Sequence, residues 1–213
     1  MMKNYDVDLK ISYRLTKKLN IGSSYAIKTK ADIPVLRIWS DKGKHVYIPG
    51  SSLKGVMRTA AIRVANLLGD YKVEYSVEPG KIKNFVKDIV VELFGGPHKK
   101  TSKIYVSGIM LSKVNTTILT HVSIDDSTRT AKEGALYRVE YIPPYTTMET
   151  WIHGRNLSIE EARLLFASIL ELNYERIGKS GLCSVRILRN ESRVPEDLLK
   201  DPIIKIIWEG IGV

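Results

Sequence analysis

The residues best suited to bind an anion follow a Pro49-Gly50 turn, where a helix is expected to begin. Ser51 or Ser52 can serve as its N-cap, because a serine hydroxyl accepts a hydrogen bond from the first-turn N–H groups. The first turn carries no acid, and Lys54 and Arg58 share one face at i and i+4. Since a helix N-terminus already favours negative charge, these residues form a candidate phosphate seat. An ordinary surface helix with a basic face is the alternative.

A strand end at residues 46–48 and a helix over 51–69 are expected to position this seat. Apolar residues recur in the helix with a helical period, which predicts a buried stripe. These residues are Leu53, Val56, Met57, Ala60, Ile62, Val64 and Leu67.

Composition favours a folded protein with a polyanionic partner. The chain has 213 residues, of which 44% are hydrophobic, enough for the core of one large domain or two small ones. The formal charge is +10 and the sequence pI is about 9.5. Because the basic residues are spread along the whole chain, we expect an extended basic surface rather than a basic tail. A protein that is merely basic is the alternative.

Several other classes lack their sequence signals. The single Cys183 excludes an intramolecular disulfide and is expected to be a small buried residue. The polar start and the absence of a long apolar run argue against a signal peptide and a membrane partner, so a cytoplasmic location is expected. Four isolated histidines give no zinc spacing, and no hydrolase triad or Walker loop is present.

The remaining pattern predicts an α+β fold. Alternating or apolar runs predict strands over 5–15, 33–39, 45–48, 103–111, 136–153 with a break at Pro143-Pro144, and 182–188. Residues 41–44, Asp-Lys-Gly-Lys, are read as the tip of a hairpin that leads into the strand at 45–48. Helices are predicted over 84–94 and from Ser158, where Glu161 completes a capping box. Without insertions the order is strand, helix, strand, strand, helix, strand. This is the plan of a ferredoxin-like (RRM-like) antiparallel sheet with two helices.

We expect a single domain over residues 1–213, in which insertions form a thumb and a lid. Its core is expected at 5–15, 46–69, 103–115 and 136–190, its insertions at 17–45, 70–102 and 116–135, and its tail at 191–213. The apolar end of the tail is read as a helix or strand on the body, or as an exposed contact for a neighbour.

Residues 47–55, Tyr-Ile-Pro-Gly-Ser-Ser-Leu-Lys-Gly, with Met57 and Arg58, resemble the signature of the RAMP superfamily. The resemblance is to the backbone, target-RNA-cleaving subunits of type III CRISPR effector complexes. Further stretches agree in order, at 21–22, 31–37, 93–95, 122–140 and 178–181. The last of these, Gly-Lys-Ser-Gly, has fewer glycines than is usual in the superfamily.

The resemblance implies partners and RNA contacts. Such subunits stack along a CRISPR guide RNA with copies of themselves or paralogous RAMP subunits and with other effector-complex proteins, and they meet complementary target RNA. The face bearing Ser51, Ser52, Lys54 and Arg58 would hold guide phosphates, and Lys179 and Ser180 would assist from the glycine loop. Residues 116–135 would form the thumb between guide and target bases, where His121 and Arg129 could stack or pair. A solvated loop is the alternative for this segment.

The resemblance also implies a catalytic residue. Target-cleaving subunits carry an aspartate before a Pro-Val-hydrophobic-Arg strand, and Asp32 holds that position here. Lys28, Lys30 and Arg37 flank Asp32 and favour its ionised form. Asp32 would bind a divalent metal (Mg²⁺ or Mn²⁺) beside the scissile phosphate, with RNA supplying further ligands, or help to deprotonate a ribose 2′-hydroxyl.

Two other functions remain open. A non-catalytic structural paralogue would carry Asp32 only as a surface residue paired with a nearby lysine. An endoribonuclease that processes the guide precursor would need a histidine near the first helix, for which His45 is the candidate.

Overall fold

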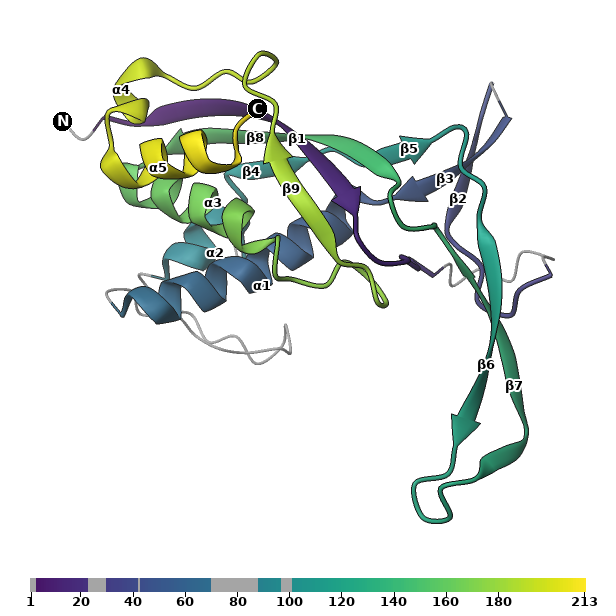
Figure 1. Ribbon diagram of the computed structural model, residues 1–213. Coiled ribbons are helices and arrows are strands. Elements are labelled where there is room, and N and C mark those ends of the chain that lie inside the picture. The colour runs from purple at the N-terminus through teal and green to yellow at the C-terminus, as the bar shows by residue number, and fades with distance from the viewer. Residues whose placement is uncertain (1–2, 23–29, 42, 70–87, 97–100) are drawn as a thin grey trace.

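A four-stranded antiparallel sheet forms the centre of the protein. The computed structural model describes residues 3–22, 30–41, 43–69, 88–96 and 101–213. The sheet has the strand order β4-β8-β1-β9 (Figure 1). Its strands are β1 (Tyr5–Leu15), β4 (Ile104–Val106), β8 (Thr147–Leu157) and β9 (Cys183–Ile187). Alternate residues of β1 are buried, as their polar and apolar alternation predicts.

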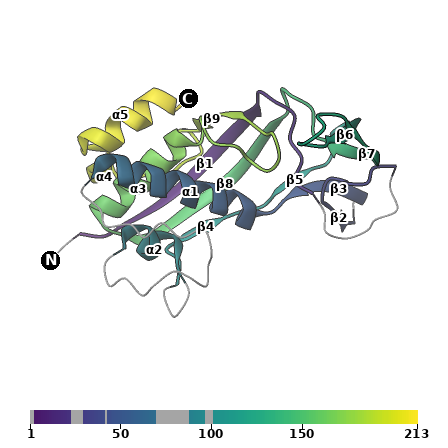
Figure 2. The same ribbon diagram turned by 90° about the horizontal axis from the view of Figure 1, so that it is seen from below.

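Helices cover one face of this sheet. Figure 2 shows α1 (Gly50–Leu68) and α3 (Ile159–Glu171) crossing the same face. The strands of this sheet and the two helices follow one another along the chain in the order β1, α1, β4, β8, α3 and β9. The predicted α+β class is therefore confirmed, and the strand order is compatible with the ferredoxin-like plan.

The predicted capping box is present, since Ser158 Oγ accepts from Glu161 N–H and the Glu161 carboxylate accepts from Ser158 N–H. Of the predicted helix over 84–94, the structure describes α2 (Ile89–Phe94), whose N-cap is Asp88. Residues 84–87 lie outside the described residues. Cys183 is buried, and burial raises the pKa of its thiol to about 12.

A small sheet lies beside the main one, with the order β2-β3-β5. β2 (Arg37–Ser40) and β3 (Gly43–Ile48) form the predicted hairpin. β5 (Ile109–Leu111) pairs with β3, so the single strand predicted over 103–111 is wrong. The chain leaves the main sheet at Ser107, which pairs with Trp151, and a side chain at Gly108 would clash with the ring of Tyr47.

A third sheet is a two-stranded hairpin that projects from the body (Figure 1). It consists of β6 (Thr117–Ile124) and β7 (Ala131–Tyr141). The strand predicted over 136–153 is therefore two strands in different sheets, because β7 belongs to the hairpin and β8 to the main sheet. The break at Pro143-Pro144 occurs where it was expected.

The C-terminal residues form two helices, α4 (Glu196–Leu199) and α5 (Pro202–Ile211). Ile204, Ile207 and Ile211 are buried, and α5 packs against α3. Among the described residues, no helix combines the length and the apolar character needed to cross a membrane.

Candidate functional site

The predicted phosphate seat lies at the N-terminus of α1, but the helix begins two or three residues earlier than a Ser51 or Ser52 cap would place it. Pro49 is the N-cap, and no side chain caps the helix. The prediction of Ser51 or Ser52 as the N-cap is wrong. Gly50 lies so close to β4 that a Cβ there would be 2.0 Å from the Val106 carbonyl oxygen, and this contact fixes the helix start. Both serines therefore lie in the first turn.

The buried side of α1 is narrower than predicted. Leu53, Met57 and Ala60 are buried as expected, whereas Leu67 is 78% exposed. The inward position at that end of the helix belongs instead to Ala65. Small residues there allow α1 to approach α3.

Lys54 and Arg58 differ in how the fold uses them. Arg58 donates a hydrogen bond to the Gly95 carbonyl oxygen at 2.7 Å, which ties α1 to the end of α2. Lys54 is half-buried and has no carboxylate partner among the described residues. Burial, and then the nearby charge of Arg58, lower the pKa of Lys54. A cation with few internal partners remains available to an anion.

Asp32 is tied to β7. Its Oδ2 accepts a hydrogen bond from Arg138 N–H at 2.6 Å and lies 3.8 Å from Arg138 Nε. The backbone pairs in the other direction as well, since Asp32 N–H donates to the Arg138 carbonyl. The Asp32 side chain is still 51% exposed. Of the expected cationic neighbours, Arg37 pairs elsewhere and Lys28 lies outside the described residues.

Glu140 is the partner of Arg37, and this pair was not predicted. The Arg37 guanidinium donates to both Glu140 carboxylate oxygens, with Nη1 2.7 Å from Oε2. Thr116 Oγ1 and Val35 N–H also donate to the carboxylate. Burial alone would raise the pKa of Glu140, but these hydrogen bonds and the charge of Arg37 outweigh burial and lower it. The pair joins the 33–37 segment to the base of the hairpin.

The hairpin places His121 and Arg129 at different points. His121 lies in β6, where its ring stacks on Tyr137 with centroids 5.5 Å apart. Its Nε2 is 3.0 Å from the Tyr141 hydroxyl. Arg129 lies in the loop that joins the strands and has a positive φ of 54°. The two residues therefore do not form one cluster.

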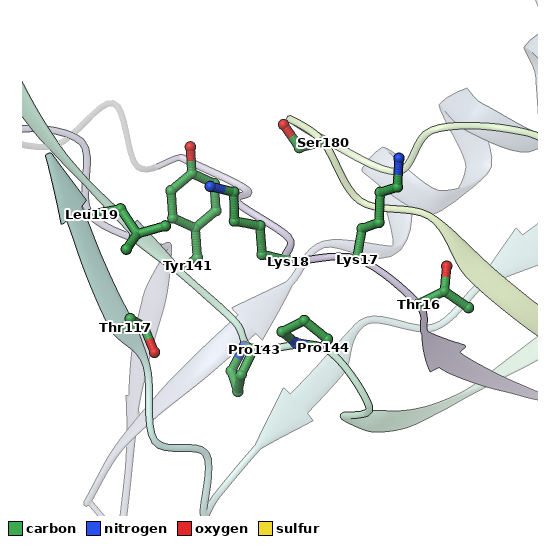
Figure 3. Close-up of a pocket in the computed structure, with 9 residues that line it drawn as sticks. All are labelled: Thr16, Lys17, Lys18, Thr117, Leu119, Tyr141, Pro143, Pro144 and Ser180. Atoms are coloured by element: carbon green, nitrogen blue, oxygen red, sulfur yellow. The ribbon is translucent and has the colours of Figure 1, made fainter. Parts of the chain in front are cut away.

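The glycine loop packs against the segment that follows β1. The Lys179 and Asn20 backbones exchange hydrogen bonds, and a Cβ at Gly178 would lie 2.5 Å from the Asn20 carbonyl oxygen. Ser180 lines a cavity of about 360 Å³ next to the hairpin base (Figure 3). The other lining residues are Thr16, Lys17, Lys18, Thr117, Leu119, Tyr141, Pro143 and Pro144.

This cavity was not predicted from the sequence. Lys18 Nζ lies 4.6 Å from the centre of the Tyr141 ring, a cation–π contact. Figure 3 shows Lys17 and Lys18 on one segment between Ser180 and the Pro143-Pro144 turn. The only signal in the sequence is the Lys17-Lys18 pair itself, because its partners come from distant segments.

Asp32 would have to bind a metal ion without further side-chain ligands from a group of acids, histidines or cysteines in the described part of the chain. No group of three or more His, Cys, Asp or Glu side chains there could hold a metal ion. A single exposed carboxylate fits a metal only if a bound phosphate supplies other ligands. Because Arg138 occupies Oδ2, the other oxygen is the better placed donor.

Comparisons with known proteins agree with this architecture. No curated protein sequence matches the chain. The fold is similar to a chain in the cryo-EM structure described as type III-B Cmr-beta in the apo state, with a TM-score of 0.62 and 11% sequence identity. That match covers 86% of this chain and 98% of the other. The family model of the RAMP superfamily matches residues 15–182. The chain that carries the uncapped α1 and the projecting hairpin therefore belongs to the RAMP superfamily.

Proposed function

We propose that the protein is an RNA-binding backbone subunit of a type III CRISPR interference complex, which stacks along a guide RNA and cleaves complementary target RNA. Membership of the RAMP superfamily and the fold likeness to a type III-B Cmr-beta chain support this proposal. The observation that carries it is the N-terminus of α1, where no side chain caps the helix and Lys54 follows one turn after Gly50.

Guide phosphates would bind at this N-terminus. Ser51 and Ser52 would donate from their hydroxyls, and Lys54 would supply the charge. Arg58 retains donors beyond the one that it gives to Gly95, so it can contact the next phosphate. Such contacts recognise the RNA backbone and not the bases. A subunit that must accept any guide sequence requires contacts of this kind.

The glycine loop and the hairpin would continue the RNA path. Lys179 and Ser180 would contact the guide near Lys17 and Lys18, whose cavity Ser180 lines. The hairpin would act as the thumb that separates guide from target bases. His121 would stack from β6, and Arg129 would reach RNA or a neighbouring subunit from the tip.

Asp32 would be the catalytic residue for target cleavage. Arg138 N–H orients its carboxylate, which leaves one oxygen for the substrate. Asp32 would help to take the proton from a ribose 2′-hydroxyl, so that this oxygen attacks the adjacent phosphorus and the 5′-oxygen leaves. A divalent cation, Mg²⁺ or Mn²⁺, would supply charge stabilisation at the phosphate. Copies of this chain or paralogues, other effector proteins and a cytoplasmic location complete the proposal.

The test uses Asp32→Asn in the assembled complex. Asparagine keeps an oxygen that accepts from Arg138 N–H but loses the negative charge. We expect guide and target binding to persist while cleavage of complementary RNA at this subunit's position is lost. Asp126→Asn, an exposed acid in the hairpin loop, is the matched control and should cleave normally. Undiminished cleavage by Asp32→Asn would contradict the catalytic assignment.

A non-catalytic paralogue is the second candidate, and a specific observation favours it. Asp32 already has a structural partner in Arg138. The same assay decides, because wild-type complexes of this paralogue would bind target without cutting it. For processing of the guide precursor, His45 is poorly placed. His45 is only 4% exposed, and its Nε2 lies 2.8 Å from Ser40 Oγ.

A further inference from the structure

The face of the main sheet opposite the helices carries a column of aromatic rings. Side chains alternate between the two faces of a strand. In β8 the buried residues Met148, Thr150 and Ile152 face α1 and α3, so Trp151 and His153 lie on the other face. Tyr105 of β4 is paired with His153 and is 65% exposed. Figures 1 and 2 show α1, α2 and α3 on the opposite side of the sheet.

The three rings are stacked in sequence. The Tyr105 and His153 centroids are 6.0 Å apart with planes inclined by 27°. The Trp151 and His153 centroids are 5.9 Å apart with planes inclined by 12°. The row of rings thus spans two neighbouring strands, with Tyr105 exposed and Trp151 and His153 partly exposed to solvent.

Charged neighbours hold this column in place. His153 Nδ1 lies 2.6 Å from Asp8 Oδ1, which also accepts from Arg155 Nη2. Burial would raise the pKa of Asp8, but the hydrogen bonds from His153 and Arg155 outweigh burial and lower it. Lys10 Nζ lies 5.2 Å from the Trp151 ring centre. The rings are thus oriented before any ligand arrives, which reduces the entropy lost on binding.

A cavity opens beside the column. Its volume is about 480 Å³, and it is lined by Asp8, Trp151, His153, Glu191 and Arg193. This volume lies within the usual range for sites that hold small organic groups. Two of its walls are aromatic, which suits a flat ring system.

The charge of this face suits a polyanion. Cations outnumber acids among the side chains on and beside it, and the acids Asp8 and Glu149 already pair with Arg155 and Lys10. The cations are Lys10, Arg14, Arg155, Arg186 and Arg193, and the acids are Asp6, Asp8, Glu149 and Glu191. Arg186 and Arg193 are exposed.

We propose that this face is a second RNA-binding surface, on which bases of single-stranded RNA stack against Trp151, His153 and Tyr105. Arg186 and Arg193, which both lie on the β1 and β9 side of the rings, contact the phosphates of the strand whose bases are stacked. The combination of exposed rings with surrounding cations is how sheet surfaces bind single strands. The proposal goes beyond guide binding at α1, because α1 covers the other face of the sheet.

The first measurement follows the fluorescence of Trp151 in the full-length chain. Trp39→Phe and Trp208→Phe together leave Trp151 as the only tryptophan. Titration with an eight-nucleotide single-stranded RNA should quench its emission in parallel with the anisotropy of a labelled copy of the RNA. An RNA of the same length without bases should not quench. Absent RNA binding, or RNA binding that leaves Trp151 emission unchanged, overturns the proposal.

The second measurement compares variants by anisotropy at one salt concentration. Trp151→Ala should weaken binding by about 5- to 100-fold, the range for one lost base stack. Trp151→Phe should recover most of the affinity, and Trp39→Ala, which removes an exposed tryptophan elsewhere, should change it less than twofold. RNA should still quench Trp151 fluorescence in the Lys54→Glu variant. The assay therefore distinguishes loss of RNA binding at the α1 site from loss of RNA binding at the sheet face. Equal binding by Trp151→Ala and wild type overturns the proposal and favours a protein partner on this face.

Discussion

The hairpin base and the N-terminus of α1 both carry charged residues of the RAMP signature stretches, but they use them in opposite ways. At the hairpin base, Glu140 is 5% exposed and its carboxylate binds Arg37, Thr116 and Val35 N–H. At α1 no side chain caps the helix, and Lys54 has no carboxylate partner among the described residues. The charges at the hairpin base are satisfied within the fold, whereas the charge of Lys54 remains open to a ligand.

The comparison predicts its largest effect at Glu140. Glu140→Ala leaves the Arg37 guanidinium partly buried without its carboxylate, which should lower the free energy of unfolding by about 3 kcal/mol. Urea denaturation followed by circular dichroism measures this loss. Glu133→Ala, an exposed glutamate in the same strand, is the control and should change stability by less than about 0.5 kcal/mol.

The pH dependence provides a second check on Glu140. Its pKa is lower in the folded protein than in the unfolded chain, so the stabilisation is fully present above the ordinary glutamate pKa of about 4.3. It is lost as the pH falls through the lower pKa of the folded state. The stability difference between wild type and Glu140→Ala should therefore shrink in acid. A difference that does not depend on pH would mean that Arg37 is stabilised by other groups.

A smaller effect, on binding and not on stability, is expected at Lys54. Lys54→Glu should reduce affinity for single-stranded RNA by about tenfold at low salt, because one phosphate contact is lost and a repulsion is gained. The slope of log affinity against log salt should become shallower by about 0.7 for each phosphate released. Lys205→Glu, at an exposed position of α5, is the control for net charge. Equal slopes of log affinity against log salt in wild type and Lys54→Glu would mean that Lys54 does not contact RNA phosphates.

The smallest effect is expected for the stability of Asp32→Ala. The side chain is 51% exposed and makes one backbone hydrogen bond, so its loss should cost about 1 kcal/mol or less in thermal unfolding. A loss as large as that of Glu140→Ala would mean that Asp32 belongs with the structural charges. In that case every charged residue of the hairpin base would be structural, and only the N-terminus of α1 would carry a charge that is open to a ligand.

Local pattern predicted the parts of the fold that depend on neighbouring residues. The alternation in β1, the hairpin of β2 and β3, and the Ser158 capping box are all confirmed because each is written within a few residues. The projecting hairpin, in contrast, was expected at residues 116–135 only from the resemblance to the RAMP superfamily, because the polar segment by itself was equally compatible with a solvated loop.

Features set by distant segments were missed. The start of α1 depends on contact between Gly50 and Val106, and the break between β4 and β5 depends on Trp151 and Tyr47. The Arg37–Glu140 pair joins residues more than a hundred positions apart. Neither the secondary-structure propensity of single residues nor the spacing of residue types along the chain predicts contacts between distant segments. The roles of Asp32, Lys54 and the glycine loop stay predictions, which the variants above test.

The hairpin of β6 and β7 has a consequence for how binding energy is used. Beyond its base it consists of two paired strands, and the side chains of Ile124 and Leu136 are 59% and 72% exposed. A lone pair of strands in water is only marginally stable. The hairpin is therefore held rigidly at its base, where Arg37 binds Glu140, and is flexible towards its tip. A ligand that binds the outer hairpin must offset the conformational entropy lost when these strands become ordered. This cost lowers the affinity and raises the dissociation rate.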